Sequence, residues 1–236
     1  MNPTEALLVQ IMDVIAFRFD RHAVLRGDMV LRVLGCERLT NDLDYVFVPY
    51  ASKKDVVGEV LAALAGIEGA SIRHSLNSKC LRVVLTRDQV SVQVEIKTAA
   101  EIPTKQLSNR DMARRYGFPP RLLPVVDYPV ALADKMAAWN ERRLVRDVYD
   151  IYFYLRMGVR PDRTVLEKRL AKPAYSPLIR KTDQFTGKTH EEFITFLRNK
   201  VERLDDETIA DSLRDYLPAD DLAGLSMRFR AELAKL

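Results

Sequence analysis

The sequence lacks the features of membrane, secreted and disulfide-stabilised proteins. No apolar run approaches the ~20 residues needed to cross a bilayer, and Met1–Glu5 contains no basic segment of a signal peptide. The two cysteines, Cys36 and Cys80, are too few for a disulfide framework or a zinc site, and we interpret them as small semi-buried side chains. We therefore expect a cytoplasmic globular protein that does not bind a membrane.

The sequence also lacks a strong excess of one charge. Its 37 basic and 33 acidic residues leave a net charge of +4, which does not by itself indicate a nucleic-acid-binding protein. The charges are unevenly placed, because residues 156–203 carry 12 basic and 6 acidic side chains, and residues 204–236 carry 4 basic and 8 acidic ones. The basic segment is compatible with binding a polyanion and equally with ordinary solvated helix faces.

Hydrophobic periodicity predicts alternating helices and strands over residues 1–103. The clearest strand is 90–97, where four aliphatic side chains share one face and Ser91, Gln93, Glu95 and Lys97 share the other. The predicted helices are Met29–Leu34, Lys53–Ala65 and one from the N-cap Thr4 to Phe19, and the predicted strands are Ala23–Arg26, Leu43–Val48, Ser71–His74, Leu81–Leu85 and Val90–Lys97.

The character of the chain changes after Pro103. Residues 104–128 are polar and interrupted by prolines, which predicts a linker, and residues 129–236 read as helical almost throughout. We therefore predict an α+β protein with a small mixed β-sheet core and packed helices over residues 1–103, followed by an all-helical C-terminal region. The predicted C-terminal helices are 130–142, 146–156, 161–171, 189–204, 206–216 and 220–235.

An acidic pair, Asp42 and Asp44, stands at the start of the predicted strand Leu43–Val48. Residues two apart on a strand project to the same side, so both carboxylates face one way. Two oxygen ligands on one face suit Mg²⁺, which binds carboxylates together with nucleotide phosphates and water. Surface strands often carry such a pair, so the pattern alone is a weak signal.

Three neighbouring features strengthen the interpretation of the pair. Gly27, between a strand and a helix, permits a close approach of the backbone to phosphate. Glu95, on the polar face of its strand, would complete a two-metal site and accept the proton of an attacking hydroxyl. Lys135 would neutralise charge on a triphosphate. Taken singly, they also read as a turn glycine, an exposed glutamate and a solvated lysine.

Three segments together resemble the AbiEii/AbiGii toxin family of nucleotidyltransferases: LRGDMVLRVLGCERLTNDLDYVF, VQVEIKTA and ALADKMAAWNERRLVRDVYDIYFYL. The resemblance covers roughly residues 20–156, with a fairly specific order and spacing. It implies a DNA-polymerase-β-like core with a helical C-terminal region. The family pattern has a Gly-Gly turn, a D-x-D, a later acidic strand residue, a lysine and an R-D-x-x-D helix start, and these fall on Gly27, Asp42 and Asp44, Glu95, Lys135, and Arg146, Asp147 and Asp150.

The resemblance implies a role for each of these residues. The acidic residues Asp42, Asp44 and Glu95 would hold Mg²⁺ in a two-metal site, with Glu95 as a candidate base. The remaining residues would bind or orient the nucleotide: Gly27 at the phosphates, Lys135 at the triphosphate, Asp147 or Asp150 orienting Lys135 or the nucleotide, Arg146 in the same helix start, and Thr40 beside the acidic pair with a hydroxyl for substrate. Arg32 and Arg38 are interpreted as surface arginines or electrostatic helpers.

One position departs from the family pattern. Asp28 stands where the family has its second glycine, and a carboxylate there would repel a triphosphate. Three consequences stay open: Asp28 points away from the nucleotide, it helps to hold metal, or the chain is impaired in catalysis.

The implied reaction transfers a nucleoside monophosphate from an NTP to an acceptor hydroxyl. The resemblance also implies a bacterial toxin–antitoxin pair, with a cognate antitoxin as partner and tRNA or another RNA as the acceptor. Three alternatives remain: a nucleotidyltransferase for a small molecule such as an antibiotic or sugar, a degenerate module that binds nucleotide without turnover, and a structural protein whose acids are coincidental.

Overall fold

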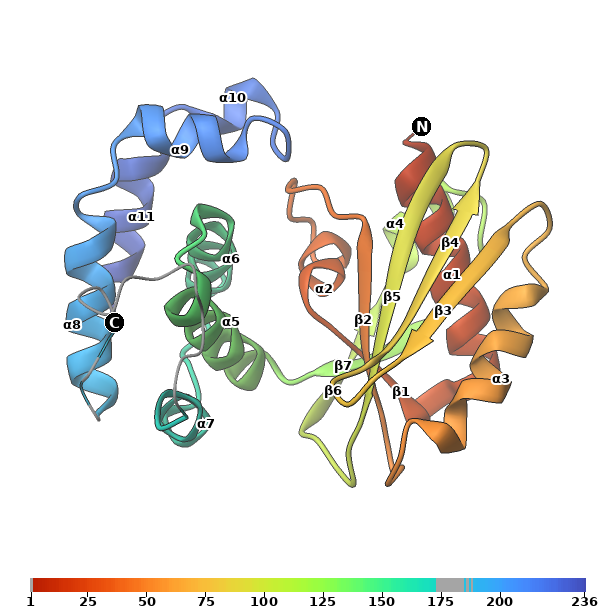
Figure 1. Cartoon of the computed structure of the whole chain (residues 1–236). Helices are drawn as coiled ribbons and strands as arrows, with labels where there is room; N and C mark the ends of the chain where they lie inside the picture. Colours follow the sequence, from red (N-terminus) through yellow and green to blue (C-terminus); the bar gives the residue numbers. More distant parts are fainter. Residues whose placement is uncertain (1, 173–184, 186, 188) are drawn as a thin grey trace. The chain divides into compact units, whose positions relative to one another are not determined.

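The computed structural model describes residues 2–172, 185, 187 and 189–236. The chain divides into two compact units, residues 1–127 and residues 128–236 (Figure 1). Unit 1 is a mixed sheet with helices, and unit 2 is helical in its described part, so the predicted fold class is confirmed. No helix in the described part of the chain has both the length and the apolar character required to cross a membrane.

Unit 1 is built on a seven-stranded sheet with the order β3-β4-β5-β2-β1-β7-β6. The β2–β5 and β1–β7 pairs are parallel, and the other neighbouring pairs are antiparallel. Strand β2 therefore lies in the interior of the sheet, between β5 and β1. The strands are β1 (Ala23–Arg26), β2 (Asp42–Phe47), β3 (Ser71–Leu76), β4 (Leu81–Arg87), β5 (Val90–Thr98), β6 (Thr104–Ser108) and β7 (Leu122–Val126).

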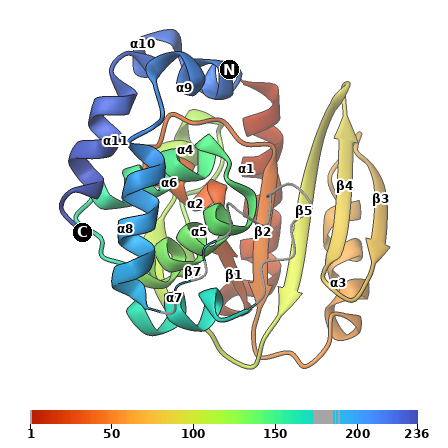
Figure 2. The same ribbon diagram turned by 60° about the vertical axis from the view of Figure 1, so that its left-hand side comes forward.

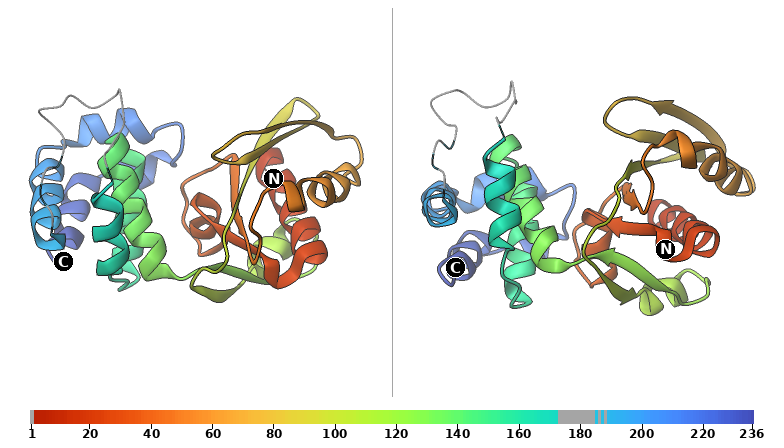
Figure 3. Two further views of the ribbon diagram at one scale, coloured as in Figure 1. Left: turned by 60° about the horizontal axis from the view of Figure 1, so that its bottom comes forward. Right: turned by 90° about the horizontal axis from the view of Figure 1, so that it is seen from below.

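Two helices of unit 1 pack together against one face of this sheet, α1 (Pro3–Phe19) and α3 (Lys54–Ala65) (Figures 1 and 3). The alternation of β5 explains why, because its aliphatic side chains Val92, Val94 and Ile96 are fully buried while the intervening polar ones are not. The short helix α2 (Asp28–Val33) contacts β1 and β2, η1 (Asp20–His22) follows α1, and α4 (Arg110–Arg115) lies between β6 and β7 in sequence.

Helix α1 begins two residues earlier than predicted. Its N-cap is Asn2, whose side-chain oxygen accepts hydrogen bonds from the backbone N–H groups of Thr4 and Glu5 at 3.0 and 3.3 Å. Pro3 occupies the first helical position, where its missing N–H costs nothing. The prediction of Thr4 as the cap was therefore wrong, because two cap-type residues flank Pro3 and the sequence does not rank them.

A buried carboxylate, that of Glu5, links three helices of unit 1. Glu5 is 5% exposed and pairs with the buried Arg32 of α2, and it accepts a 2.5 Å hydrogen bond from the hydroxyl of Tyr116, which follows α4. Burial alone would raise the pKa of Glu5, but the hydrogen bonds from Tyr116 and Arg32 outweigh it and lower the pKa. Burial and this bond raise the pKa of Tyr116 to about 12. Arg32 is thus a structural residue rather than a surface arginine.

Replacing Glu5 with glutamine should lower the free energy of unfolding of unit 1 by about 3 kcal/mol, because it removes the buried counter-charge of Arg32. Urea unfolding followed by circular dichroism would measure the loss. The single tryptophan, Trp139, lies in unit 2, so its fluorescence follows the unfolding of that unit separately. The matched control is Glu37→Gln, since Glu37 also approaches Arg32, at 3.9 Å, but is 65% exposed. An equal loss in both variants would contradict the proposed importance of burial.

The same substitution should change the pH dependence of stability. The pKa of Glu5 in the folded protein lies below the unfolded value of 4.5. Its carboxylate therefore stabilises the fold fully above pH 4.5, and this stabilisation is lost as the pH falls through the folded pKa. The stabilities of the wild-type protein and the Glu5→Gln variant should accordingly converge on acidification.

The segment predicted as a linker, residues 104–128, instead completes the sheet. It forms β6, α4 and β7, and β7 pairs with β1 through Leu25 and Val125. Pro124 lies within β7, opposite Gln106 of β6. The prediction treated each proline as a break in structure, but a proline is tolerated in a strand wherever its missing N–H is not required by the ladder.

Unit 2 consists of helices in its described part (Figures 2 and 3). The predicted helix 220–235 is interrupted, because Gly224 adopts a left-handed conformation with φ of 66°. Helix α8 begins with a capping box. The Thr189 side chain accepts a hydrogen bond from the backbone N–H of Glu192, and the Glu192 side chain accepts one from the backbone N–H of Thr189. The helices are α5 (Tyr128–Arg142), α6 (Val145–Arg156), α7 (Arg163–Leu170), α8 (His190–Val201), α9 (Asp206–Leu213), α10 (Ala219–Leu222) and α11 (Leu225–Leu233).

Candidate active site

The acidic pair lies at the beginning of β2, as predicted. Asp42 and Asp44 are both partly exposed, whereas Leu43 between them is fully buried, so the two carboxylates share the face opposite to the core side chain. Asp44 is in register with Arg26 on β1 and with Glu95 on β5. Cross-strand partners share a face, so the third predicted carboxylate comes directly beside the pair.

Glu95 is held by two neighbouring side chains. Its Oε1 atom accepts hydrogen bonds from Nε and Nη2 of Arg82 at 3.1 and 2.7 Å, and from the amide of Gln93 at 3.1 Å. Arg82 is the cross-strand partner of Glu95 on β4. The register row across the sheet is therefore Arg26, Asp44, Glu95 and Arg82, in which two basic residues flank two acidic ones. Among the residues that the structure describes, no group of three or more His, Cys, Asp or Glu side chains is arranged to hold a metal ion.

Gly27 makes room for Asp44. It has a φ of +75°, and a Cβ atom placed on it would lie 2.5 Å from Oδ2 of Asp44, well inside van der Waals contact. Only glycine accommodates both the left-handed backbone and this close approach. The helix that follows, α2, has six residues. A helix this short provides only a weak binding site for phosphate at its N-terminus. The role that the structure supports for Gly27 is to leave space for the Asp44 carboxylate.

Asp28, which departs from the family pattern, has a buried counter-charge. Its Oδ2 atom lies 2.7 Å from Nη2 of Arg38, whose side chain is 2% exposed. Arg38 is thus neither a surface arginine nor a free cation. The repulsion expected between Asp28 and a triphosphate is reduced accordingly, because the carboxylate is already neutralised within unit 1.

Thr40 supports the backbone at the start of β2. Its hydroxyl oxygen accepts a 3.2 Å hydrogen bond from the N–H of Asp42. This bond fixes the entry of the chain into the strand. A substrate contact for the Thr40 hydroxyl remains a prediction.

Three further predicted residues of unit 2 take part in two ion pairs: Lys135, Asp147 and Asp150. Lys135 of α5 pairs with Asp150 of α6, whose side chain is 1% exposed. Arg142 donates to both carboxylate oxygens of Asp147, at 2.6 and 3.2 Å. The predicted orientation of Lys135 by an aspartate of this segment is consistent with the first pair.

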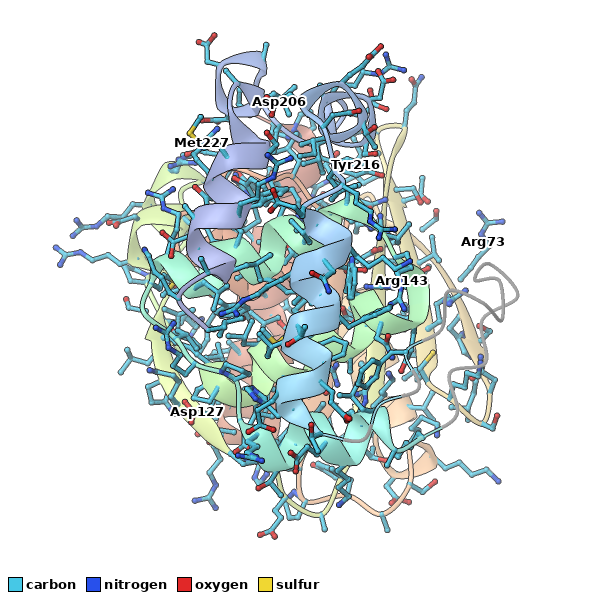
Figure 4. All side chains as sticks on the ribbon, turned by 90° about the vertical axis from the view of Figure 1, so that its left-hand side faces the viewer. Arg73, Asp127, Arg143, Asp206, Tyr216 and Met227 are labelled. Atoms are coloured by element: carbon cyan, nitrogen blue, oxygen red, sulfur yellow. The ribbon has the colours of Figure 1, made fainter. Side chains whose placement is uncertain are left out.

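Arg146 completes the predicted set within unit 2. Its guanidinium carbon lies 6.0 Å from the centroid of the Tyr216 ring, a cation–π distance. Figure 4 labels Tyr216 and, on the α5–α6 connection, Arg143. Whether Arg146 contacts nucleotide remains a prediction.

Three arginines of these clusters were not predicted as part of the site: Arg26, Arg82 and Arg142. Arg38 was predicted only as a surface arginine or an electrostatic helper. The positions of Arg26 and Arg82 can be predicted once the strand register is known, because they are the cross-strand partners of Asp44 and Glu95. The sequence gives no comparable signal for Arg38, whose pairing with Asp28 depends on how the loop after α2 folds back.

The fold is that of nucleotidyltransferases. Nearly the whole chain, 99% of it, aligns with 83% of MenT4, a nucleotidyltransferase toxin from Mycobacterium tuberculosis H37Rv, with a TM-score of 0.62 and 17% identity. It also aligns over its full length with 92% of JHP933 from Helicobacter pylori, with a TM-score of 0.57 and 11% identity. A second H. pylori structure, a putative nucleotidyltransferase, gives the same TM-score at 12% identity, with 100% of this chain and 95% of that chain covered.

The family is identified by sequence. The profile of the family described as nucleotidyl transferase AbiEii toxin, type IV TA system, matches residues 11–231. The chain therefore belongs to the AbiEii family of nucleotidyltransferase toxins. A search of curated proteins found no match. The match extends the resemblance well beyond residue 156, into the helices that the sequence motifs left unassigned.

Proposed function

We propose that this toxin transfers a nucleoside monophosphate from an NTP to a hydroxyl of an RNA acceptor in the cytoplasm, with pyrophosphate leaving. The observation that supports this most directly is the juxtaposition of Asp42, Asp44 and Glu95 on one face of two adjacent strands, in a chain of a nucleotidyltransferase family. The family implies an NTP substrate and an antitoxin. A tRNA acceptor is the specific form of the proposal.

The donor set fits a divalent cation. Carboxylate oxygens are the ligands that Mg²⁺ prefers, and Asp42 and Asp44 present them on one face of β2. We propose that these two residues hold the ion, with Glu95, which pairs with Arg82 in the structure, as the candidate third ligand. When bound, Mg²⁺ neutralises phosphate charge and orients the triphosphate.

The chain's own residues prepare this chemistry. Gly27 keeps the space that the Asp44 carboxylate occupies. Arg82 and Gln93 fix Glu95, which is the candidate to accept the proton of the attacking hydroxyl. In unit 2, Lys135 is paired with the buried Asp150, and a contact between Lys135 and the triphosphate remains a prediction.

The test is incubation of the protein with Mg²⁺, total RNA and each α-labelled NTP in turn, with the Asp44→Asn variant as control. Label on RNA that is lost in the variant is the expected result. Label found only on a small-molecule acceptor would overturn the RNA part of the proposal. Mg²⁺-dependent NTP binding without pyrophosphate release would identify a binding module and overturn the enzymatic part.

A further inference from the structure

The basic segment 156–203 offers less free charge than its composition suggests. Arg163 pairs with Glu167 and Glu191, and Arg169 pairs with Asp134 and Glu141. Arg198 donates to the carbonyls of Leu233 and Ala234 at the end of α11. Arg180, Lys181 and Lys188 lie outside the described residues. These contacts compensate part of the positive charge of the segment within unit 2.

Unit 1 carries a polar sheet face that extends outward from the acidic pair. Over most of β4 and β5, every second side chain is aliphatic and buried in the core. The residues between them project from the other face of the sheet. We name this side the open strand face; it comprises Ser71, Arg73 and Ser75 of β3, Arg82, Val84 and Thr86 of β4, and Ser91, Gln93, Glu95 and Lys97 of β5.

The register connects this face directly to the site. Asp42 lies in the row of Gln93, Val84 and Arg73, because each is the cross-strand partner of the one before. Strands lie ~4.8 Å apart, so Arg73, three strands from Asp42, stands roughly 14 Å away along the row. Arg82 stands in the next row, two strands from Asp44, or about 10 Å away. A chain lying across these strands would reach the acidic pair at one end.

The charge of the open strand face suits phosphate. Arg73, Arg82 and Lys97, on three successive strands, are all exposed. Arg82 pairs with Glu95, the one acidic residue among the ten that define the face, so Arg73 and Lys97 supply its excess positive charge. Figure 4 shows the labelled Arg73 side chain standing clear of the ribbon at the edge of the sheet. The other side chains are hydroxyls and an amide, which hydrogen-bond to sugar and base edges, and the aliphatic Val84.

We propose that the open strand face is the binding surface for a single-stranded RNA segment that leads the acceptor hydroxyl to Asp42 and Asp44. This inference rests on the proposed function and specifies where its acceptor lies. An exposed sheet face with one basic side chain per strand matches a backbone of successive phosphates. A small-molecule acceptor bound at the acidic pair would not reach cations that lie about 10 to 14 Å away.

The test measures binding of a short fluorescent single-stranded RNA by anisotropy over a range of salt concentrations, without turnover. The variant is Arg73→Glu with Lys97→Glu, which leaves the predicted catalytic residues and Arg82 in place. The matched control is Lys54→Glu with Arg114→Glu, since both residues are exposed in unit 1 but lie outside the open strand face. The two double variants have the same net charge. Circular dichroism melts check that both fold.

The expected result is a loss of RNA affinity of about tenfold or more in the face variant at low salt, with the salt slope reduced by about 0.7 for each phosphate that the protein no longer neutralises. The control variant should bind RNA like the wild-type protein. Equal losses in the two variants would show a general charge effect and overturn the proposal, as would unchanged binding by the face variant or tighter binding of a duplex of the same sequence.

A parallel measurement separates this inference from the proposed function. Binding of a fluorescent NTP with Mg²⁺ should be unaffected in the face variant. RNA binding that depends on Arg73 and Lys97, in a protein that transfers no label, would support the surface while the proposed reaction fails. Label transfer to a small molecule without RNA binding would overturn the surface while nucleotidyl transfer stands.

Discussion

Replacing Asp44 with asparagine should reduce nucleotidyl transfer by at least about 10³-fold, because a metal-binding charge contributes several kcal/mol to stabilising the transition state. The side chain keeps its size, and Asp44 is partly exposed at a strand start, so the fold should persist. The measurement is the initial rate of label transfer at saturating NTP and Mg²⁺. A rate within threefold of the wild-type value would show that Asp44 is not a ligand of the proposed metal ion.

The control for this variant is Glu59→Gln. Glu59 is 60% exposed on α3 and pairs with Arg18 on the surface of unit 1. The substitution removes one carboxylate from the same unit without touching the strand that carries the acidic pair. Its transfer rate should match that of the wild-type protein, which would exclude a general effect of net charge.

Replacing Gly27 with alanine should reduce transfer by about 10²-fold or more, the cost expected when a catalytic group is displaced by ~1 Å. The added Cβ would lie 2.5 Å from Oδ2 of Asp44, so the carboxylate has to move. The positive φ adds a backbone cost of roughly 1–2 kcal/mol. Transfer rates and unfolding free energies of the same preparation would separate the two effects.

Gly35→Ala is the matched control. Gly35 has a φ of +91°, but a Cβ there would meet nothing within 4 Å. This variant should therefore share the backbone cost and retain normal transfer. If both variants lose activity to the same extent, backbone strain rather than the position of Asp44 is responsible.

The parts of the structure that depend on periodicity were predictable from the sequence. The alternation of β5 placed Glu95 on the polar face, and the two-residue spacing placed Asp42 and Asp44 together. The parallel pairing of β2 with β5 then places Glu95 directly beside Asp44, with Asp42 two residues earlier on the same face of β2. Local patterns suffice where burial on one face dictates the sequence.

The parts that depend on long-range pairing were not predictable. Arg32 and Arg38 are buried because carboxylates from other segments, Glu5 and Asp28, neutralise them, and sequence alone classes an isolated arginine as exposed. Residues 104–128 gave no clear periodicity because β6 and β7 are short and include Pro124. The pairing of β7 with β1, a strand near the N-terminus, leaves no local signal.

That pairing also sets the order in which the protein can be completed on the ribosome. Strand β1, which ends at the glycine turn beneath Asp44, gains its second neighbour only when Val125 has emerged to pair with Leu25. Until then the nascent sheet has a bare edge at β1, and bare edges promote association between chains. A nascent chain ending at residue 103 would carry Asp42, Asp44 and Glu95 on a sheet that still lacks β6 and β7, so the sheet that bears the proposed site is complete only after the whole of unit 1 has been synthesised.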